Sequence, residues 1–194
     1  MTKEGRIQNV SPKVYKGVTY RSTLEANTAE VLDKLGIPFQ YEYRKIVLFE
    51  GFRCPFQKDK VIAITYKPDF EIGNIMLECK GFETPEWKLK KKLLYKYLME
   101  NEPNTIFYQI HDAKKSLINV LDNHWNDFGY MIQVTSKGTK KHPQKRFEFN
   151  SIKEAISSLA LAGKNLGPIL RSLMGETEYI YGYNWKVIRK DKYD

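Results

Sequence analysis

The sequence predicts an α/β core on a mixed β-sheet, followed by a small α+β module with a helix-turn-helix-like pattern. Helical and strand-like segments follow one another over residues 20–125 in the order helix, three strands, helix, strand, helix. That order is typical of helices packed on a sheet. The aromatic and aliphatic content is that of a globular protein. The composition changes near Gly129, so we expect a core domain over 1–128 and a second module over 129–194.

The first helix is expected within residues 20–39. Ser22 and Glu25 have the S-x-x-E spacing of a capping box, in which each side chain binds a backbone N–H of the first turn. Apolar residues then recur at helical spacing, and Gly36 followed by Pro38 marks the end of the helix. Glu25 shares a face with these apolar residues, so its carboxylate is expected to point inward.

The other elements follow from local signals in chain order. In the core we expect strands at 41–52, 61–72, 74–82 and 104–111, a loop at 54–60, and helices at 84–101 and 112–125. The helix at 84–101 has Thr84 as its cap and Pro85 in its first position. In the second module we expect two strands joined by a basic loop at 129–149, two short helices at 150–175 and a closing strand at 179–188.

The charge of the chain favours a polyanionic partner. The net charge is +9, and residues 129–194 contribute 12 Lys and Arg against 6 Asp and Glu. A basic excess of this kind suits nucleic acid, although a soluble basic protein with no such partner would share it. No stretch approaches the 18 apolar residues of a membrane span, and the N-terminus lacks an apolar signal core, which favours the cytosol. Cys54 and Cys79 match no metal or redox spacing and are expected to be reduced thiols.

Two carboxylates and a lysine interrupt an apolar hairpin over residues 66–81, YKPDFEIGNIMLECKG. Glu78 and Lys80 are two residues apart in a strand and therefore share a face. A turn through Gly73 would bring Asp69 beside Glu78. Converging carboxylates form a hard-oxygen site that suits Mg²⁺, and a nearby lysine can position water or stabilise charge on a phosphate. The alternative is a solvated hairpin face with a Glu78–Lys80 ion pair.

Glu25 strengthens the catalytic interpretation, because an inward carboxylate on the first helix is a candidate third acidic group for the same site. Its alternative role is that of the capping-box glutamate alone, and the two roles are compatible. Three histidines are far apart in the sequence and have no ligand spacing, so we assign them no chemistry: His111, His124 and His142.

Four stretches between Tyr20 and Ile110 carry a resemblance to a known family: TYRSTLEANTAEVLDKLGIPFQYE, YKPDF, LECKG and KLKKKLLYKYL. In motif, order and spacing they resemble the PD-(D/E)xK nucleases, and within these the phage endonuclease I group, whose best-known members resolve branched DNA. The resemblance implies a restriction-endonuclease-like core, a homodimer, and Mg²⁺ as cofactor with Mn²⁺ able to substitute. It also implies the catalytic residues Glu25, Asp69, Glu78 and Lys80, with metal held by the three carboxylates and the backbone carbonyl of Cys79.

The lysine-rich helix at 84–101 is expected to face DNA. An apolar stripe is predicted along Leu89, Leu93 and Tyr97 with flanking leucines. Lysines recur on another face at Lys88, Lys92 and Lys96, with Lys91 beside them. A row of this kind suits phosphate contacts, and its alternative is an ordinary solvated face.

The second module resembles the nuclease-associated modular DNA-binding domains, the NUMOD family, over residues 131–188. The matching pieces are FNSIKEA, LGPILRSLMG and YGYNWKVI, whereas the turn ALAGKNLGP departs from the usual short turn. Ser151 and Glu154 form a second capping box. In a helix-turn-helix the second helix enters the major groove, so Lys164, Asn165 and Arg171 are candidate DNA contacts. The alternative is a helical hairpin that only packs on the core.

These expectations combine in a cytosolic, phage-associated, Mg²⁺-dependent DNA endonuclease that acts as a homodimer. Three functions stay open. A site-targeted, homing-type nuclease is favoured by the second module, and a nuclease that resolves Holliday junctions or other branched DNA is favoured by the resemblance of the core. A DNA-binding protein without cleavage is the third.

Overall fold

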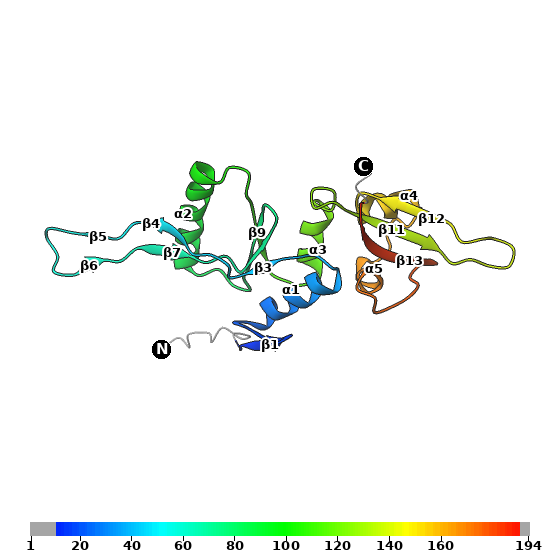
Figure 1. The fold of residues 1–194 in the computed structure, drawn as a ribbon, viewed down its shortest axis with the longest axis horizontal. Coiled ribbons are helices and arrows are strands. Elements are labelled where there is room, and N and C mark those ends of the chain that lie inside the picture. The colour runs from blue at the N-terminus through cyan, green and yellow to red at the C-terminus, as the bar shows by residue number, and fades with distance from the viewer. Residues whose placement is uncertain (1–10, 191–194) are drawn as a thin grey trace.

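The structure, a computed structural model, describes residues 11–190. The molecule is elongated, and a β-hairpin arm projects from each end of a central body of helices and sheets (Figure 1). This mixture of helices and strands confirms the α/β class. In the described part of the chain, no helix is long and apolar enough to cross a lipid bilayer.

A four-stranded sheet forms the centre of the N-terminal part. Its strand order is β10 (Ile106–Ile110), β9 (Ile75–Cys79), β8 (Phe70–Ile72) and β3 (Gln40–Tyr41). Strands β10 and β9 are parallel and the other pairs are antiparallel, which confirms a mixed sheet. All five residues of β9 are buried, because packed side chains cover both of its faces.

The β8–β9 hairpin turns through Gly73, as predicted. Gly73 has a φ of +56°, a left-handed conformation that favours glycine. A Cβ at this position would also lie 3.3 Å from the Phe128 ring. The turn pairs Phe70 with Leu77, so the register continues to Asp69 and Glu78 on the two adjoining positions.

Helix α1 (Thr23–Lys34) begins and ends where the sequence predicts. The Ser22 hydroxyl accepts a hydrogen bond from the Glu25 N–H over 3.2 Å. At the other end Gly36 has a φ of +69°, and the N–H groups of Gly36 and Ile37 close the helix on the carbonyls of Asp33 and Leu32. A short hairpin of β1 (Lys13–Tyr15) and β2 (Val18–Tyr20), which has no counterpart among the predicted elements, packs beside α1.

The strand-like runs at 41–52 and 61–72 are each broken into shorter strands, because the chain leaves the core to form a protruding ribbon (Figure 1). The ribbon contains β4 (Ile46–Phe49), β5 (Phe52–Arg53), β6 (Lys60–Val61) and β7 (Ile64–Tyr66). Strand β4 pairs with β7 and β5 pairs with β6, both antiparallel. The predicted loop is confirmed at the tip, between β5 and β6.

Helix α2 (Pro85–Asn101) has the expected cap, because the Thr84 hydroxyl accepts a hydrogen bond from the Trp87 N–H. Its buried face consists of Trp87, Leu94 and Leu98, which pack with residues of β4, β7 and β9. The predicted apolar stripe is wrong at Leu89, whose exposed fraction is 59%. The indole of Trp87 takes the place next to the sheet, and this rotates the buried face of the helix away from Leu89.

The C-terminal part has the predicted elements. A three-stranded antiparallel sheet has the order β12 (Arg146–Phe149), β11 (Tyr130–Ser136), β13 (Tyr183–Arg189). Helices α4 (Ile152–Ser158) and α5 (Leu166–Leu173) follow β12 and are separated by a turn with Gly163 at a φ of +79°. Helix α3 (Lys115–Asp122) leads into this part from the core.

The two parts share one hydrophobic cluster, which runs from α1 and β9 through α3 to β11 and α5. Polar contacts join them as well. The buried Asp122 carboxylate at the end of α3 accepts hydrogen bonds from the N–H groups of Ile152 and Lys153, the first residues of α4. The Tyr130 hydroxyl donates to the Gly36 carbonyl. Experiments on either part therefore require the whole chain, because cutting it near Phe128 would expose this cluster.

Candidate active site

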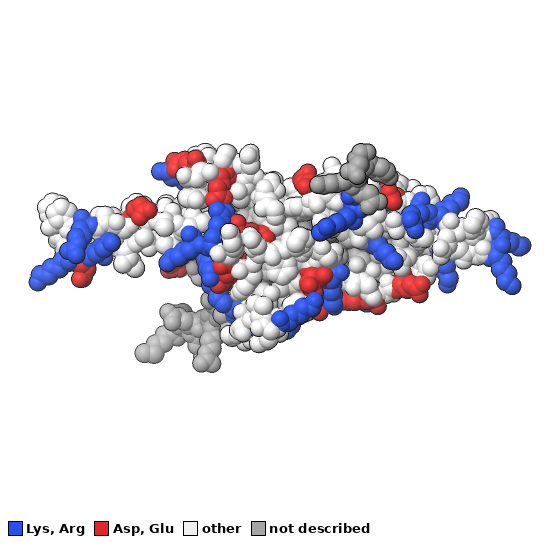
Figure 2. Space-filling model, in the orientation of Figure 1, with Lys and Arg blue, Asp and Glu red and all other residues white. Residues whose placement is uncertain are grey.

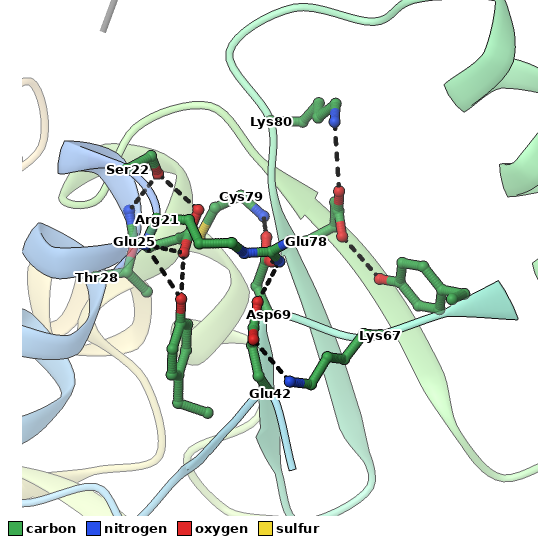
Figure 3. Close-up of polar contacts among 12 residues, drawn as sticks. Arg21, Ser22, Glu25, Thr28, Glu42, Lys67, Asp69, Glu78, Cys79 and Lys80 are labelled. Atoms are coloured by element: carbon green, nitrogen blue, oxygen red, sulfur yellow. Dashed lines mark hydrogen bonds and ion pairs between the residues drawn. The ribbon is translucent and has the colours of Figure 1, made fainter. Parts of the chain in front are cut away.

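Asp69 and Glu78 lie at the same end of the β8–β9 hairpin and are both buried, with exposed fractions of 3% and 6%. Asp69 precedes β8, and its Oδ2 accepts a hydrogen bond of 2.7 Å from the Cys79 N–H, next to Glu78 in β9 (Figure 3). The hairpin thus places the two carboxylates together, as the Gly73 turn predicts. Burial of two acidic groups in one place is costly unless each finds compensating partners.

Each carboxylate also accepts a hydrogen bond from a side chain of another segment. The Arg21 guanidinium, just before α1, donates to Asp69 Oδ1 over 3.0 Å and also contacts Glu42. The Tyr66 hydroxyl, at the end of β7, donates to Glu78 Oε2 over 2.9 Å. These contacts fix the orientation of both carboxylates and leave Glu78 Oε1 directed toward Lys80.

Burial and neighbouring negative charges raise the pKa values of both acids. Burial is the main cause that raises the pKa of Asp69 to about 6, and the charge of Glu25 contributes to this rise. Burial also raises the pKa of Glu78 to about 8, and the charge of Asp69 is the second cause. A raised pKa means that the negative charge of the acid is unfavourable where it stands, and a bound cation would relieve this. Acids with pKa values perturbed in this way are common at functional sites.

Glu25 lies on the other side of Asp69 in a network of its own (Figure 3). Its carboxylate accepts hydrogen bonds from the Ser22 hydroxyl over 2.8 Å, from the Tyr41 hydroxyl over 2.6 Å and from the Arg21 N–H over 3.1 Å. Glu25 is buried and points inward, as expected. Its contacts with Arg21 and Ser22 confirm the capping role at the start of α1, and its charge acts on Asp69. Its expected role as a third acidic group of a metal site stays a prediction.

Lys80 extends from the end of β9 toward Glu78. Its Nζ lies 3.8 Å from Glu78 Oε1 and 5.2 Å from the centroid of the Trp87 ring. The side chain is one-third exposed, so the ammonium group stays accessible to solvent and to an anionic substrate. The aromatic face of Trp87 further favours a cation at this place.

The residues fit a hard divalent cation in donor type, because carboxylate oxygens and backbone carbonyls are the groups that Mg²⁺ prefers. Asp69 and Glu78 supply two such carboxylates, and the Cys79 carbonyl lies between Glu78 and Lys80 in the chain. Within residues 11–190, no group of three or more His, Cys, Asp and Glu side chains is arranged to hold a metal ion. Glu25 therefore lies beside the pair and does not complete a three-carboxylate cluster, since its oxygens are engaged by Ser22 and Tyr41.

Several side chains that support the site were not predicted from the sequence, because their contacts depend on how the segments pack in the fold. They are Arg21, Tyr41, Glu42, Tyr66 and Trp87. Glu42 also binds the Lys67 ammonium over 2.8 Å and has a positive φ of 43°. Only Arg21 could have been noticed, as the residue that directly precedes the capping Ser22.

Residues of strand β10 lie next to the site. Gln109 lies opposite Glu78 in the parallel ladder, and its Oε1 accepts hydrogen bonds from Trp87 Nε1 over 3.0 Å and from Lys91 Nζ over 3.4 Å. His111, to which the sequence pattern assigns no chemistry, contacts the Lys80 carbonyl through Nδ1. This contact fixes the backbone at Lys80, so His111 helps to position the lysine.

The four lysines of α2 lie in different environments. Lys88, Lys92 and Lys96 are exposed and form the expected row. Lys96 lies 3.8 Å from Glu100, whereas neither Lys88 nor Lys92 forms an ion pair with another described residue. Lys91 lies partly buried beside the site, where it pairs with Glu83. The row is therefore available to an anionic partner through Lys88 and Lys92 in particular.

The three candidate contacts of the C-terminal part are also differently engaged. Asn165 is the cap of α5, because its Oδ1 accepts the Gly167 N–H over 2.9 Å. The Lys164 ammonium lies 5.4 Å from the centroid of the Tyr181 ring. Arg171 is exposed on α5. Lys164 and Arg171 are thus exposed cations, whereas the amide oxygen of Asn165 is already used within the chain.

The raised pKa values predict a distinctive pH dependence of stability in the absence of divalent metal. The folded state retains protons on Asp69 and Glu78 that the unfolded chain releases near its ordinary values of about 4. The free energy of unfolding should therefore fall as the pH rises from about 4 to about 8. Urea unfolding in EDTA at pH 5, 6.5 and 8 measures this slope.

Glu78→Gln keeps an acceptor for Tyr66 but removes the titrating group, so its stability should fall less over the same pH range. Added Mg²⁺ should stabilise the wild type more at pH 8 than at pH 6, because the ion binds ionised carboxylates. If the free energy of unfolding falls equally with pH in the wild type and in Glu78→Gln, the titration of Glu78 does not cause the pH dependence.

The site consists of two neighbouring buried carboxylates, a third carboxylate beside them and one accessible lysine. Side chains from the start of α1 and from β3, β7, β10 and α2 support these groups. Basic residues on α2 and in the C-terminal part lie outside it. Comparisons of the chain with protein-family models, with curated proteins and with solved structures find no match.

Proposed function

We propose that the chain is a metal-dependent endonuclease that hydrolyses phosphodiester bonds in DNA, with a PD-(D/E)xK core. The observation that carries the proposal is the hairpin site, in which the buried Asp69 and Glu78 occupy facing positions and Lys80 lies beside Glu78. Each buried acid has a cation near it, Arg21 at 3.0 Å from Asp69 and Lys80 at 3.8 Å from Glu78. Acids with strongly perturbed pKa values are common at functional sites. The exposed lysines of α2 and the net charge of +9 supply the affinity for a phosphate backbone.

In this proposal Asp69, Glu78 and the Cys79 carbonyl hold Mg²⁺ or Mn²⁺, and Glu25 supports the ion from beside Asp69. The bound ion would supply Lewis acidity for the scissile phosphate and for a water nucleophile. Tyr66 and Arg21 keep the two carboxylates oriented. Lys80 positions the water or stabilises the negative charge that grows on the phosphate.

Two biological roles fit this chemistry. Site-targeted, homing-type cleavage is favoured by the C-terminal part. Residues 129–194 carry a net charge of +6, and the buried residues that the structure describes there share a hydrophobic cluster with the N-terminal part. Resolution of branched DNA is favoured by the order of the catalytic motifs, which resembles that of the phage endonuclease I group. In either role both strands of the DNA must be cut, and each chain has one proposed site. Two copies of the chain in a homodimer would supply one site for each strand.

Cleavage of defined substrates by the full chain tests the proposal. A four-way junction and a library of linear duplexes are incubated with Mg²⁺, with Mn²⁺ and with EDTA. We expect cleavage in either metal and none in EDTA. Selective cutting within the duplex library would support targeted cleavage, whereas preference for the junction would support resolution. Binding to DNA without cleavage in either metal would overturn the nuclease proposal and leave a DNA-binding protein.

A further inference from the structure

The hairpin arm that joins β11 to β12 is the most basic feature of the C-terminal part. We define this basic arm as residues 137–146. It carries five cations and no acidic residue: Lys137, Lys140, Lys141, Lys145 and Arg146. All five are exposed, and none forms an ion pair with a residue in the described part of the chain. Basic side chains gather at this end of the molecule, beyond the body that contains the site (Figure 2).

The basic arm is an ordered ribbon. The Ser136 N–H donates to the Lys145 carbonyl over 2.8 Å, and the Lys145 N–H donates to the Ser136 hydroxyl over 2.8 Å. Nearer the tip, the Thr139 N–H donates to the His142 carbonyl over 2.7 Å. These bonds continue the β11–β12 ladder past its last paired residues, Thr135 and Arg146. A ribbon that is already formed loses little conformational entropy when it binds.

Helix α5, by contrast, exposes few side chains that could contact DNA. Its apolar residues Ile169, Leu170 and Leu173 are buried against the rest of the C-terminal part. The exposed positions of the helix are Gly167 and Arg171, so it presents one charged side chain. The expected contact residue Asn165 is used to cap the helix. A recognition helix needs several outward side chains to reach base edges.

We propose that the basic arm, and not α5, is the main DNA-contacting element of the C-terminal part. Five neighbouring cations repel one another, and a phosphate backbone relieves this repulsion with release of counterions. A two-stranded β-ribbon also has the width to lie in the major groove of duplex DNA. The inference rests on the proposed function only in taking DNA as the partner, because it requires no cleavage.

Salt-dependent binding of the full chain to a fluorescent duplex tests this assignment. Fluorescence anisotropy is measured in EDTA from 50 to 200 mM salt, so that no cleavage takes place. Three variants are compared with wild type: K140Q/K141Q in the basic arm, R171Q on α5, and K114Q/K115Q as a matched control. Lys114 and Lys115 are also adjacent, exposed lysines, but they lie at the start of α3.

K140Q/K141Q should lower the slope of log affinity against log salt by about 1.8, because each lost phosphate contact removes about 0.9. The loss of affinity between 50 and 200 mM salt would then shrink about tenfold. R171Q should change the slope by no more than about 0.9, and K114Q/K115Q should not change it. Thermal melting of each variant confirms that it is folded.

An unchanged slope in K140Q/K141Q, or a larger change in R171Q than in the arm variant, would overturn the assignment. So would a wild-type chain that does not bind DNA. Cleavage is scored separately in Mg²⁺, which keeps the two proposals apart. If binding depends on the basic arm and no cleavage occurs, the result supports the role of the basic arm and contradicts the nuclease proposal. If cleavage occurs and binding does not depend on the basic arm, the result supports the nuclease proposal and contradicts the role of the arm.

Discussion

Asp69→Asn and Glu78→Gln should each reduce Mg²⁺-dependent DNA cleavage to the background level, while the affinity for DNA stays close to that of the wild type. The two carboxylates are the hard-oxygen groups that the hairpin brings together, so loss of either charge should empty the proposed metal site. Affinity depends instead on phosphate contacts from many lysines. Both substitutions retain the shape of the side chain and one acceptor oxygen, although Asp69→Asn loses one of the two acceptors that bind Arg21 and the Cys79 N–H.

Single-turnover cleavage and DNA binding, measured side by side, give the required readouts. Glu86→Gln is a matched control, because Glu86 is an exposed carboxylate in the first turn of α2 and not a residue of the hairpin. This control should cut at the wild-type rate. A folded Asp69→Asn or Glu78→Gln enzyme that cuts equally fast in Mg²⁺ would remove these residues from the active site. Loss of cleavage in the control as well would indicate that any loss of negative charge is harmful.

The elements of the fold that follow from short-range signals were predictable from the sequence. Ser22 and Gly36 delimit α1 through hydrogen bonds to residues within one turn, and Thr84 does the same for α2. The Gly73 hairpin also depends on a local conformation. It fixes the register of β8 and β9 and thereby the meeting of Asp69 with Glu78. The core of the candidate site could therefore be located before its surroundings were known.

The surroundings of the site depend on long-range packing, which no local pattern reports. Tyr66 reaches Glu78 only because the ribbon of β4 and β7 returns to the sheet beside α2. Where the sheet meets α2 also decides which face of the helix is buried. Trp87 lies on that face and Leu89 does not. Asp122 binds the start of α4, 30 residues later, and this contact joins two parts that composition separates.

Lys80→Ala should lower the single-turnover cleavage rate about 10²–10³-fold, the usual effect of removing one group that stabilises transition-state charge. Uptake of metal should persist, because a lysine ammonium is not a ligand for Mg²⁺. The geometry supports this separation. The Lys80 ammonium lies near Glu78 Oε1 and over the Trp87 ring, while Tyr66 holds the other oxygen of Glu78. Glu78 therefore keeps its orientation when the lysine is removed.

Calorimetric titration with Mg²⁺, run beside the single-turnover rates, tests the two halves of this prediction separately. Lys80→Arg provides the informative comparison, since it retains the positive charge but changes the position and shape of the cationic group. If the role is electrostatic, Lys80→Arg should recover part of the rate that Lys80→Ala loses. A Lys80→Ala enzyme that binds Mg²⁺ poorly yet regains the full rate at high Mg²⁺ would contradict a role in the chemical step. It would place Lys80 among the residues that only support the metal site.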